Sequence, residues 1–140
     1  MKAIYLLVIV ALLSPACVLN AQLDDRPLMK VDIPFAFTIE NARLPAGSYL
    51  IYEVQLNRIW RVSSSDRKES VLFHISADEN GARPGQAKLI FHHYPTDYVL
   101  RRIDDGKAGI EASLFVGKRE RQLAGNHLPL GVETIIAQSE

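Results

Sequence analysis

The sequence contains a single cysteine, Cys17, in 140 residues. One thiol cannot form an intramolecular disulfide, and no cysteine cluster is present to bind zinc. Stability must therefore come from a packed hydrophobic core, which a chain of this length can bury without covalent cross-links.

The chain also lacks a dominant charge. Its 16 basic and 16 acidic residues give a formal net charge of zero at pH 7, and like charges are not gathered into long runs. Nucleic-acid phosphates and anionic membrane surfaces both require a clustered basic face. Neither nucleic acid nor a charged membrane surface is therefore an expected partner.

Long hydrophobic runs are absent except near the N-terminus. Lys2 precedes an apolar stretch over Ala3–Leu13, Ser14-Pro15 interrupts it, and a cleavage site follows at Ala21. This order of parts is typical of a signal peptide. We expect a signal peptide at 1–21 and a single β-rich domain at 22–140, exported to the periplasm or the cell exterior. The apolar stretch is too short to span about 30 Å of hydrocarbon, so no membrane span is expected in the mature chain, a retained anchor being the alternative.

Cys17 offers a second alternative for the N-terminus. Ala16-Cys17 resembles the end of the motif at which bacterial lipoproteins are cleaved before a lipid-modified cysteine. Ser14 and Pro15 fit this motif poorly. Lipidation at Cys17 would make the protein a lipid-anchored component of the cell envelope.

Alternating apolar residues indicate β-strands over most of the remaining chain. In 31–39 every odd position is large and apolar, which predicts a strand with Pro34 at a sheet edge or a bulge. Pro45 and Gly47 predict a bend into a second strand over 49–56, with Gly47 free to adopt a positive φ. Further strands are expected at 58–63, 70–76, 87–94, 98–103 and 128–137.

One segment has helical rather than strand composition. Residues 116–124 contain several good helix formers, with Ser113 as a possible cap and Gly125 as a stop signal. The predicted fold is therefore mainly β: an antiparallel sandwich or distorted barrel of about seven to eight short strands, with one short helix near the C-terminus.

The histidines are the residues most able to support catalysis. His92 and His93 are adjacent on a predicted strand and must point to opposite faces, while His74 lies on another strand. The sequence has no metal-binding H-E-x-x-H motif and no G-x-S-x-G nucleophile motif. We expect a protein that is not an enzyme and has neither a metal site nor a cofactor. The alternative is a small enzyme in which His74, His92 or His93 meets a carboxylate.

Aromatic residues provide the candidate binding site. Trp60, next to Arg61, and Tyr94 and Tyr98, around a turn, could present flat faces to a sugar or a peptide. In the alternative interpretation Trp60 fills the core, and Arg61 points the opposite way into solvent.

Three segments resemble a known group of proteins: VDIPFAFTIENARLPAGSYLI, AKLIFHHYPTDYVLRRI and GKRERQLA. The chain is similar over 31–124 to an uncharacterised family of small secreted β-rich proteins from environmental bacteria. Their shared pattern is V-x-I-P-F-x-F, then L-P-A-G-x-Y, then R-E-R-x-L-A. The resemblance implies secretion and a β-rich fold, but it assigns no catalytic or binding residue.

Together these observations favour an exported, non-catalytic binding or structural module of the periplasm or cell envelope. The expected partner is a glycan, a peptide or an envelope protein.

Overall fold

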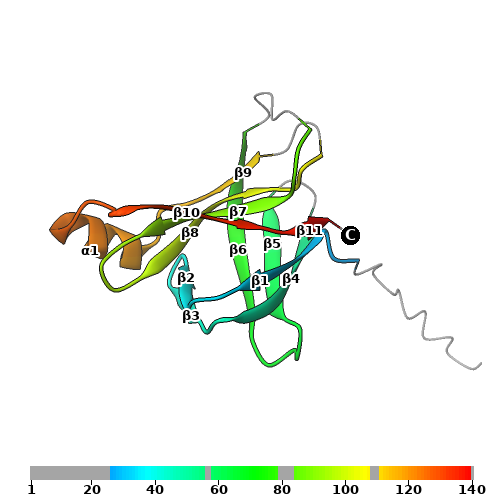
Figure 1. Cartoon of the computed structure of the whole chain (residues 1–140), viewed down its shortest axis with the longest axis horizontal. Coiled ribbons are helices and arrows are strands. Elements are labelled where there is room, and N and C mark those ends of the chain that lie inside the picture. Colours follow the sequence, from blue (N-terminus) through cyan, green and yellow to red (C-terminus); the bar gives the residue numbers. More distant parts are fainter. Residues whose placement is uncertain (1–25, 56–57, 79–83, 108–110, 140) are drawn as a thin grey trace, which may run out of the picture.

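The computed structural model describes residues 26–55, 58–78, 84–107 and 111–139. The predicted signal peptide at 1–21 and Cys17 lie outside these ranges. The described residues form a single β-rich domain with one short helix, α1 (Figure 1).

The described strands join in one sheet of eleven strands, in the hydrogen-bonded order β10-β7-β8-β9-β6-β5-β4-β1-β11, with β2 paired to β3 and β8. Strands β10 and β11 are the two ends of this order, so the sheet is open and sandwich-like rather than a closed barrel. This confirms the predicted fold class. The bounds are β1 (Met29–Ile33), β2 (Phe37–Ile39), β3 (Ala42–Leu44), β4 (Gly47–Gln55), β5 (Ile59–Ser64), β6 (Ser70–Asp78), β7 (Lys88–His93), β8 (Tyr98–Asp104), β9 (Glu111–Leu114), α1 (Lys118–Asn126), β10 (Gly131–Ile136) and β11 (Gln138–Ser139).

Strand β6 connects the two halves of the sheet. Its first part, 70–74, pairs with β5, and its second part, 75–78, pairs with β9. The hydrophobic core contains side chains from both halves, including Tyr49 and Phe73 from one and Phe91 from the other. The rings of Phe37 and Tyr49 meet edge to face at 5.2 Å, and those of Phe37 and Phe91 at 5.6 Å. Edge-to-face contact is the favoured geometry for such rings.

The segment 31–39 is not one strand, as the alternation predicted, but two. Strand β1 pairs with both β4 and β11, so it is not an edge strand, and it ends at Ile33. Pro34 follows at once and has no N–H to continue a ladder. The chain then bends, and β2 pairs antiparallel with β3 and parallel with β8, an exception to the expected antiparallel sheet.

This region contains the predicted bend, at Pro45 and Ala46 before β4, and also a tight reversal that the sequence did not predict. Glu40 and Asn41 form the turn between β2 and β3, and Glu40 has a φ of 51°. Gly47 has no positive φ and simply begins β4. Pro45 and Ala46 link β3 to β4, which are not neighbours in the sheet.

The C-terminal part differs in three details from the prediction. Ser113 lies in β9, a strand that the sequence pattern did not reveal, so it does not cap the helix. Helix α1 covers 118–126 rather than 116–124, and Gly125 lies inside it. The last predicted strand, 128–137, is shorter and begins at Gly131. Within the described ranges, no helix combines the length and apolar character needed to cross a lipid bilayer.

Candidate functional site

Helix α1 is polar apart from Leu123, Ala124 and Gly125, and the buried side chain among its nine residues is that of Glu120. A helix this short is only marginally stable in isolation. It has no apolar stripe with which to pack on the sheet. Its position at one end of the sheet, remote from the C-terminus (Figure 1), must therefore be held by polar contacts.

The Glu120 carboxylate lies at the centre of a cluster formed with His92, Tyr94 and Arg101, here called the Glu120 cluster. Oε1 is 3.1 Å from His92 Nδ1 and accepts a hydrogen bond from the Tyr94 hydroxyl at 3.2 Å. Oε2 is 3.2 Å from Arg101 Nη1, an ion pair whose geometry falls outside that of a hydrogen bond. Glu120 is 3% exposed, and this burial strengthens each electrostatic contact.

The environment of Tyr94 disfavours its ionisation. Burial raises the pKa of the Tyr94 hydroxyl, and the Glu120 carboxylate raises it further by charge repulsion and by accepting its hydrogen bond. The nearby Arg101 guanidinium opposes these effects without cancelling them. Tyr94 therefore keeps its proton, and remains a hydrogen-bond donor to Glu120, at pH values above the ordinary pKa of tyrosine.

Asp97, in the turn between β7 and β8, anchors the same helix through a second buried carboxylate. Its Oδ2 accepts a hydrogen bond from Arg119 Nη2 at 2.8 Å, and its Oδ1 is 3.7 Å from Arg43 Nη1. Arg119 and Glu120 are adjacent on α1, so one turn of the helix is fixed to the β7–β8 hairpin by two ion pairs. The helix supplies the positive charge in one pair and the negative charge in the other.

The N-terminus of α1 is held by the turn between β2 and β3. Gly117 precedes the helix and has no side chain to cap it. Asn41 serves instead, its Oδ1 accepting a hydrogen bond from the Lys118 N–H at 2.9 Å. Glu40 Oε1 accepts a hydrogen bond from the His74 N–H at 3.2 Å, at the point where β6 changes partner.

Three segments that are distant in sequence thus come together: the Glu40–Asn41 turn, the β7–β8 hairpin and α1. The same three segments contained the motifs noted in the sequence. Sequence reasoning did not identify Glu120, Asp97 or Asn41 as important. The available signal was a short predicted helix with no apolar face, which can be held only through its polar side chains.

The structure places one of the candidate histidines, His92, against a carboxylate. His92 and His93 point to opposite sides of β7, as expected: His92 contacts Glu120, and His93 stacks on Tyr98 at 4.3 Å. His74 is exposed on β6, and His127 follows the end of α1. The described residues include no group of three or more His, Cys, Asp or Glu side chains placed to hold a metal ion.

The predicted aromatic platform is not formed by all three of its residues. Trp60 is 2% exposed and belongs to the core, as in the alternative interpretation, and Tyr94 is buried against Glu120. Tyr98 is half-buried and lies between Phe35, at 3.9 Å, and His93. Burial of Trp60 and Tyr94 leaves Tyr98 as the one ring of the three that is partly open to solvent.

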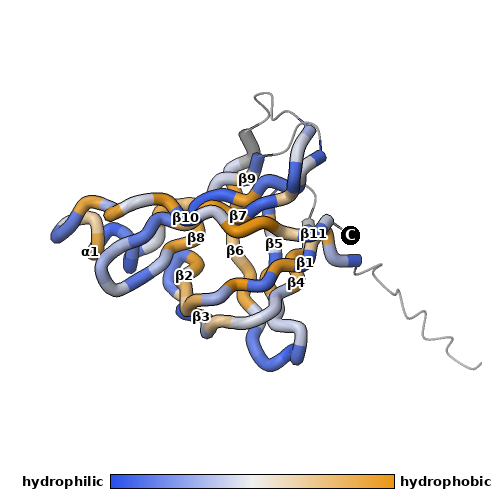
Figure 2. Tube along the Cα trace, in the orientation of Figure 1, coloured by the Kyte–Doolittle hydropathy of each residue, from blue (hydrophilic) through white to orange (hydrophobic). Residues whose placement is uncertain are grey.

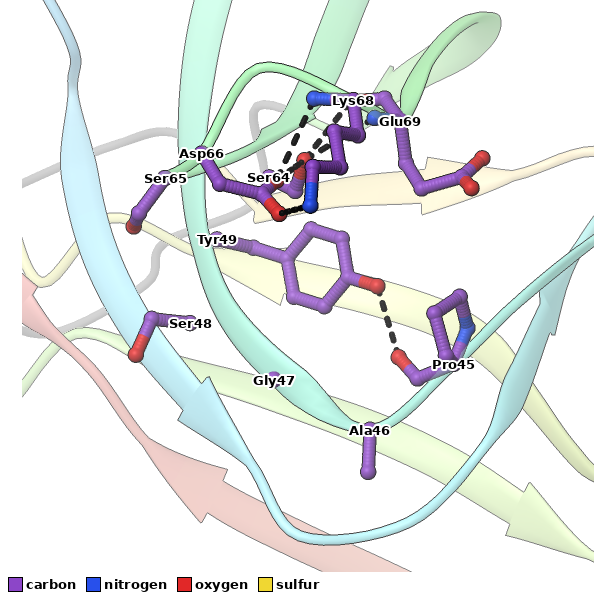
Figure 3. A pocket seen from close by; sticks show the side chains of 10 residues that line it. All are labelled: Pro45, Ala46, Gly47, Ser48, Tyr49, Ser64, Ser65, Asp66, Lys68 and Glu69. Carbon is purple, nitrogen blue, oxygen red and sulfur yellow. Dashed lines mark hydrogen bonds and ion pairs between the residues drawn. The ribbon is translucent and has the colours of Figure 1, made fainter.

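A hollow of about 360 Å³ lies between the start of β4 and the turn between β5 and β6 (Figure 3). Its polar groups already bind one another. Ser64 Oγ donates to Asp66 at 2.6 Å, and Tyr49 donates through its hydroxyl to the Pro45 carbonyl at 2.6 Å. The Ser64 hydrogen bond lowers the pKa of Asp66. The hollow is therefore a consequence of the turn between β5 and β6, and it offers few free polar groups to a ligand.

A different surface, along β10 and the residues before it, is apolar and open. Leu128 is 84% exposed, Leu130 66%, Val132 62% and Ile136 50%. Val132, Thr134 and Ile136 alternate along β10 and so share one face, and Leu128 and Leu130 precede them in the chain. Figure 2 shows hydrophobic positions recurring along the path from the end of α1 to β11. We call this set, Leu128, Leu130, Val132, Thr134 and Ile136, the β10 row.

The chain was also compared with known proteins. No family model, no curated protein sequence and no solved structure matches it.

Proposed function

We propose that the protein is an exported, non-catalytic binding or structural module of the periplasm or cell envelope, and that the β10 row is its binding surface. Export is supported by the N-terminal sequence, with its basic residue, apolar stretch and small residue at Ala21. The expected partner classes are an envelope protein, a peptide or a glycan.

The observation that carries this proposal is a contrast between two places in the molecule. The buried Glu120 carboxylate holds α1, with His92 and Tyr94 on Oε1 and an ion pair to Arg101 on Oε2. The β10 row, in contrast, exposes four large apolar side chains to solvent along β10 and the residues before it. Exposed apolar residues gathered in this way mark interaction sites in soluble proteins.

The test is a binding measurement on the purified exported chain against isolated cell-envelope material, with two variants. Val132→Lys places a charge in the middle of the β10 row, and we expect it to weaken binding at least about tenfold. Leu72→Lys is the matched control, because Leu72 is 60% exposed on β6, away from the row. Equal binding by wild type and Val132→Lys would contradict the claim that the β10 row is the binding surface. If wild type bound no envelope material at all, the claim that the protein is a binding module would be contradicted.

One observation favours a second candidate, a small enzyme. Glu120 bonded to His92 Nδ1 resembles the orienting half of a general-base pair, with the imidazole partly open to solvent. If His92 is a base, His92→Gln abolishes turnover of a model ester while the fold is retained. Equal background hydrolysis by wild type and variant would reject this candidate.

The lipid-anchored alternative rests on Cys17. Intact-mass measurement of the exported protein distinguishes it directly, because a chain beginning at Gln22 and one beginning at a lipid-modified Cys17 differ by five residues of sequence and by the acyl chains. A mass matching unmodified Gln22–Glu140 rejects the lipid anchor.

A further inference from the structure

The charged side chains around α1 are sorted by sign, and the acidic ones are turned inward. Asp97 and Glu120 are 4% and 3% exposed. Arg119 and Arg43 both contact the Asp97 carboxylate, and Arg101 forms an ion pair with that of Glu120. At this end of the molecule negative charge is therefore neutralised inside the fold.

The basic side chains at the same end lie on the surface. Those of Arg43 and Arg119 are 63% and 45% exposed, although both reach Asp97. Lys118 and Arg121 are exposed on the same helical turn as Arg119. We call Arg43, Lys118, Arg119 and Arg121 the basic end. Arg43 is far from the other three in the sequence, which is why the sequence alone predicted no clustered basic face.

Exposed apolar side chains adjoin the basic end. Phe115 and Val116 are 57% and 45% exposed, in the short segment between β9 and α1. This segment is held in place because the backbone of Gly117 packs against that of Glu40, with no room for a side chain between them. Two large apolar side chains are therefore presented to solvent directly beside Lys118.

We propose that this end of the molecule binds the surface of an anionic lipid membrane. The basic end contacts lipid phosphates, and Phe115 and Val116 enter the boundary between the head groups and the acyl chains. Proteins that bind at this boundary combine lysine and arginine, which attract anionic lipid, with large apolar side chains that insert. The surface includes no member of the β10 row, so the inference goes beyond the proposed function.

The position of these residues favours a membrane over an acidic protein as the partner. Helix α1 lies at one end of the molecule, where the chain arrives from β9 and leaves toward β10 (Figure 1). A projecting end suits a surface that yields to inserted side chains, whereas a protein partner must provide a preformed cavity for Phe115 and Val116. The helix also lacks the apolar stripe with which a helix binds in a protein groove.

The experiment is co-sedimentation of the purified exported chain with lipid vesicles. We expect binding to vesicles with about 50 mol% phosphatidylglycerol in phosphatidylcholine, and no binding to phosphatidylcholine alone. Because the attraction is between charges at a surface, it should fall as NaCl rises from about 0.05 M to about 0.5 M.

The charge contribution is tested by the double variant Lys118→Gln with Arg121→Gln. It leaves both arginines that contact Asp97 in place and should weaken binding at least about tenfold, since each basic residue near an anionic surface is worth about fivefold. The matched control is Lys30→Gln with Lys68→Gln, which removes two exposed charges from β1 and from the turn between β5 and β6. We expect this control to bind like wild type.

The apolar contribution is tested by Phe115→Gln, which should weaken binding about tenfold by removing the inserted ring. Leu72→Gln is its control, because Leu72 is 60% exposed on β6 and Phe115 is 57% exposed. Substitutions at exposed positions such as these leave the fold intact.

A wild-type chain that binds neither vesicle overturns the proposal. So does equal binding to both vesicles, or a double variant of Lys118 and Arg121 that binds as well as wild type. Polyglutamate, measured in parallel, distinguishes the other partner class: if it binds through Lys118 and Arg121 while the vesicles do not bind, the basic end recognises acidic peptide and the proposal is wrong.

Discussion

The carbonyl oxygen of Glu40 occupies the space that a side chain on Gly117 would need. A Cβ atom built on Gly117 would stand 2.1 Å from that oxygen and 2.5 Å from the carbonyl carbon. Glu40 has little freedom to withdraw, because its φ of 51° is that of a tight turn and its carboxylate accepts the His74 N–H. The turn between β2 and β3 and the start of α1 therefore fit together only with glycine at position 117.

Gly117→Ala should destabilise the protein by about 2 kcal/mol or more, since backbone must move to admit the methyl group. Gly125→Ala is the matched control inside α1, where an added Cβ meets nothing within 4 Å. This control should raise stability by about 0.8 kcal/mol, the helix-propensity difference between glycine and alanine. Urea denaturation of both variants tests the pair, and equal effects would contradict the close contact at Gly117.

Asn41→Ala should cost about 1 kcal/mol, because it removes the oxygen that accepts the Lys118 N–H at the start of α1. Asn41→Asp keeps that oxygen and adds a negative charge at the positive end of the helix dipole. We expect Asn41→Asp to be at least as stable as wild type in thermal unfolding. Equal destabilisation by both changes would show that Asn41 does not act as the cap.

Glu120→Ala should destabilise the fold by about 3 kcal/mol, because it leaves Arg101 without its ion-pair partner in a largely buried position. Gln122→Ala, at an exposed position on the same helix, should change stability by less than about 0.5 kcal/mol. Loss of α1 from the sheet should also appear as faster amide exchange over 118–126. A Glu120→Ala variant as stable as wild type would contradict the anchoring role of the Glu120 cluster.

The raised pKa values of Tyr49 and Tyr94 predict a loss of stability at high pH. Burial is the larger cause in both cases, followed by the negative charge of Glu69 for Tyr49 and of Glu120 for Tyr94. Below the ordinary tyrosine pKa of 10.0 both rings are neutral in the folded and unfolded states, and the stabilisation is fully present. Above it the unfolded chain loses protons first, so the free energy of unfolding falls as pH rises through the raised values.

Tyr94→Phe should make this decline shallower, since one of the two titrating groups is gone. Urea denaturation at a series of pH values from about 8 to 11 gives the slope for wild type and variant. Identical slopes would mean that Tyr94 ionises as readily in the folded protein as in the unfolded chain.

The sequence was sufficient to predict the fold class because strand alternation depends on local pattern alone. The successive strands around Trp60, Phe73 and Phe91 all bury alternate side chains, as a period of two requires. What the pattern could not show was long-range pairing. The parallel contact of β2 with β8 and the division of β6 between two partners depend on how distant segments meet.

The position of α1 was not predictable for the same reason. Its cap, Asn41, is 77 residues away from Lys118, and its buried carboxylate, that of Glu120, contacts residues of two other strands. Local propensity placed a helix near the correct residues, but only tertiary contacts fix its first residue. For Trp60 the structure agrees with the interpretation that it fills the core, and Tyr94 is buried as well, which composition alone could not show because it does not say which face of a strand is buried.

Amide hydrogen exchange at residue resolution tests most directly the claim that the β10 row is the working surface of this protein. We predict that the N–H groups of Val132 and Thr134, which alternate with those directed at β7, exchange rapidly in the free protein and become protected when envelope material is added. The N–H of Ala137, already bonded to Ala87, should show no such dependence. Equally rapid exchange of Val132 and Thr134 with and without envelope material would contradict the account.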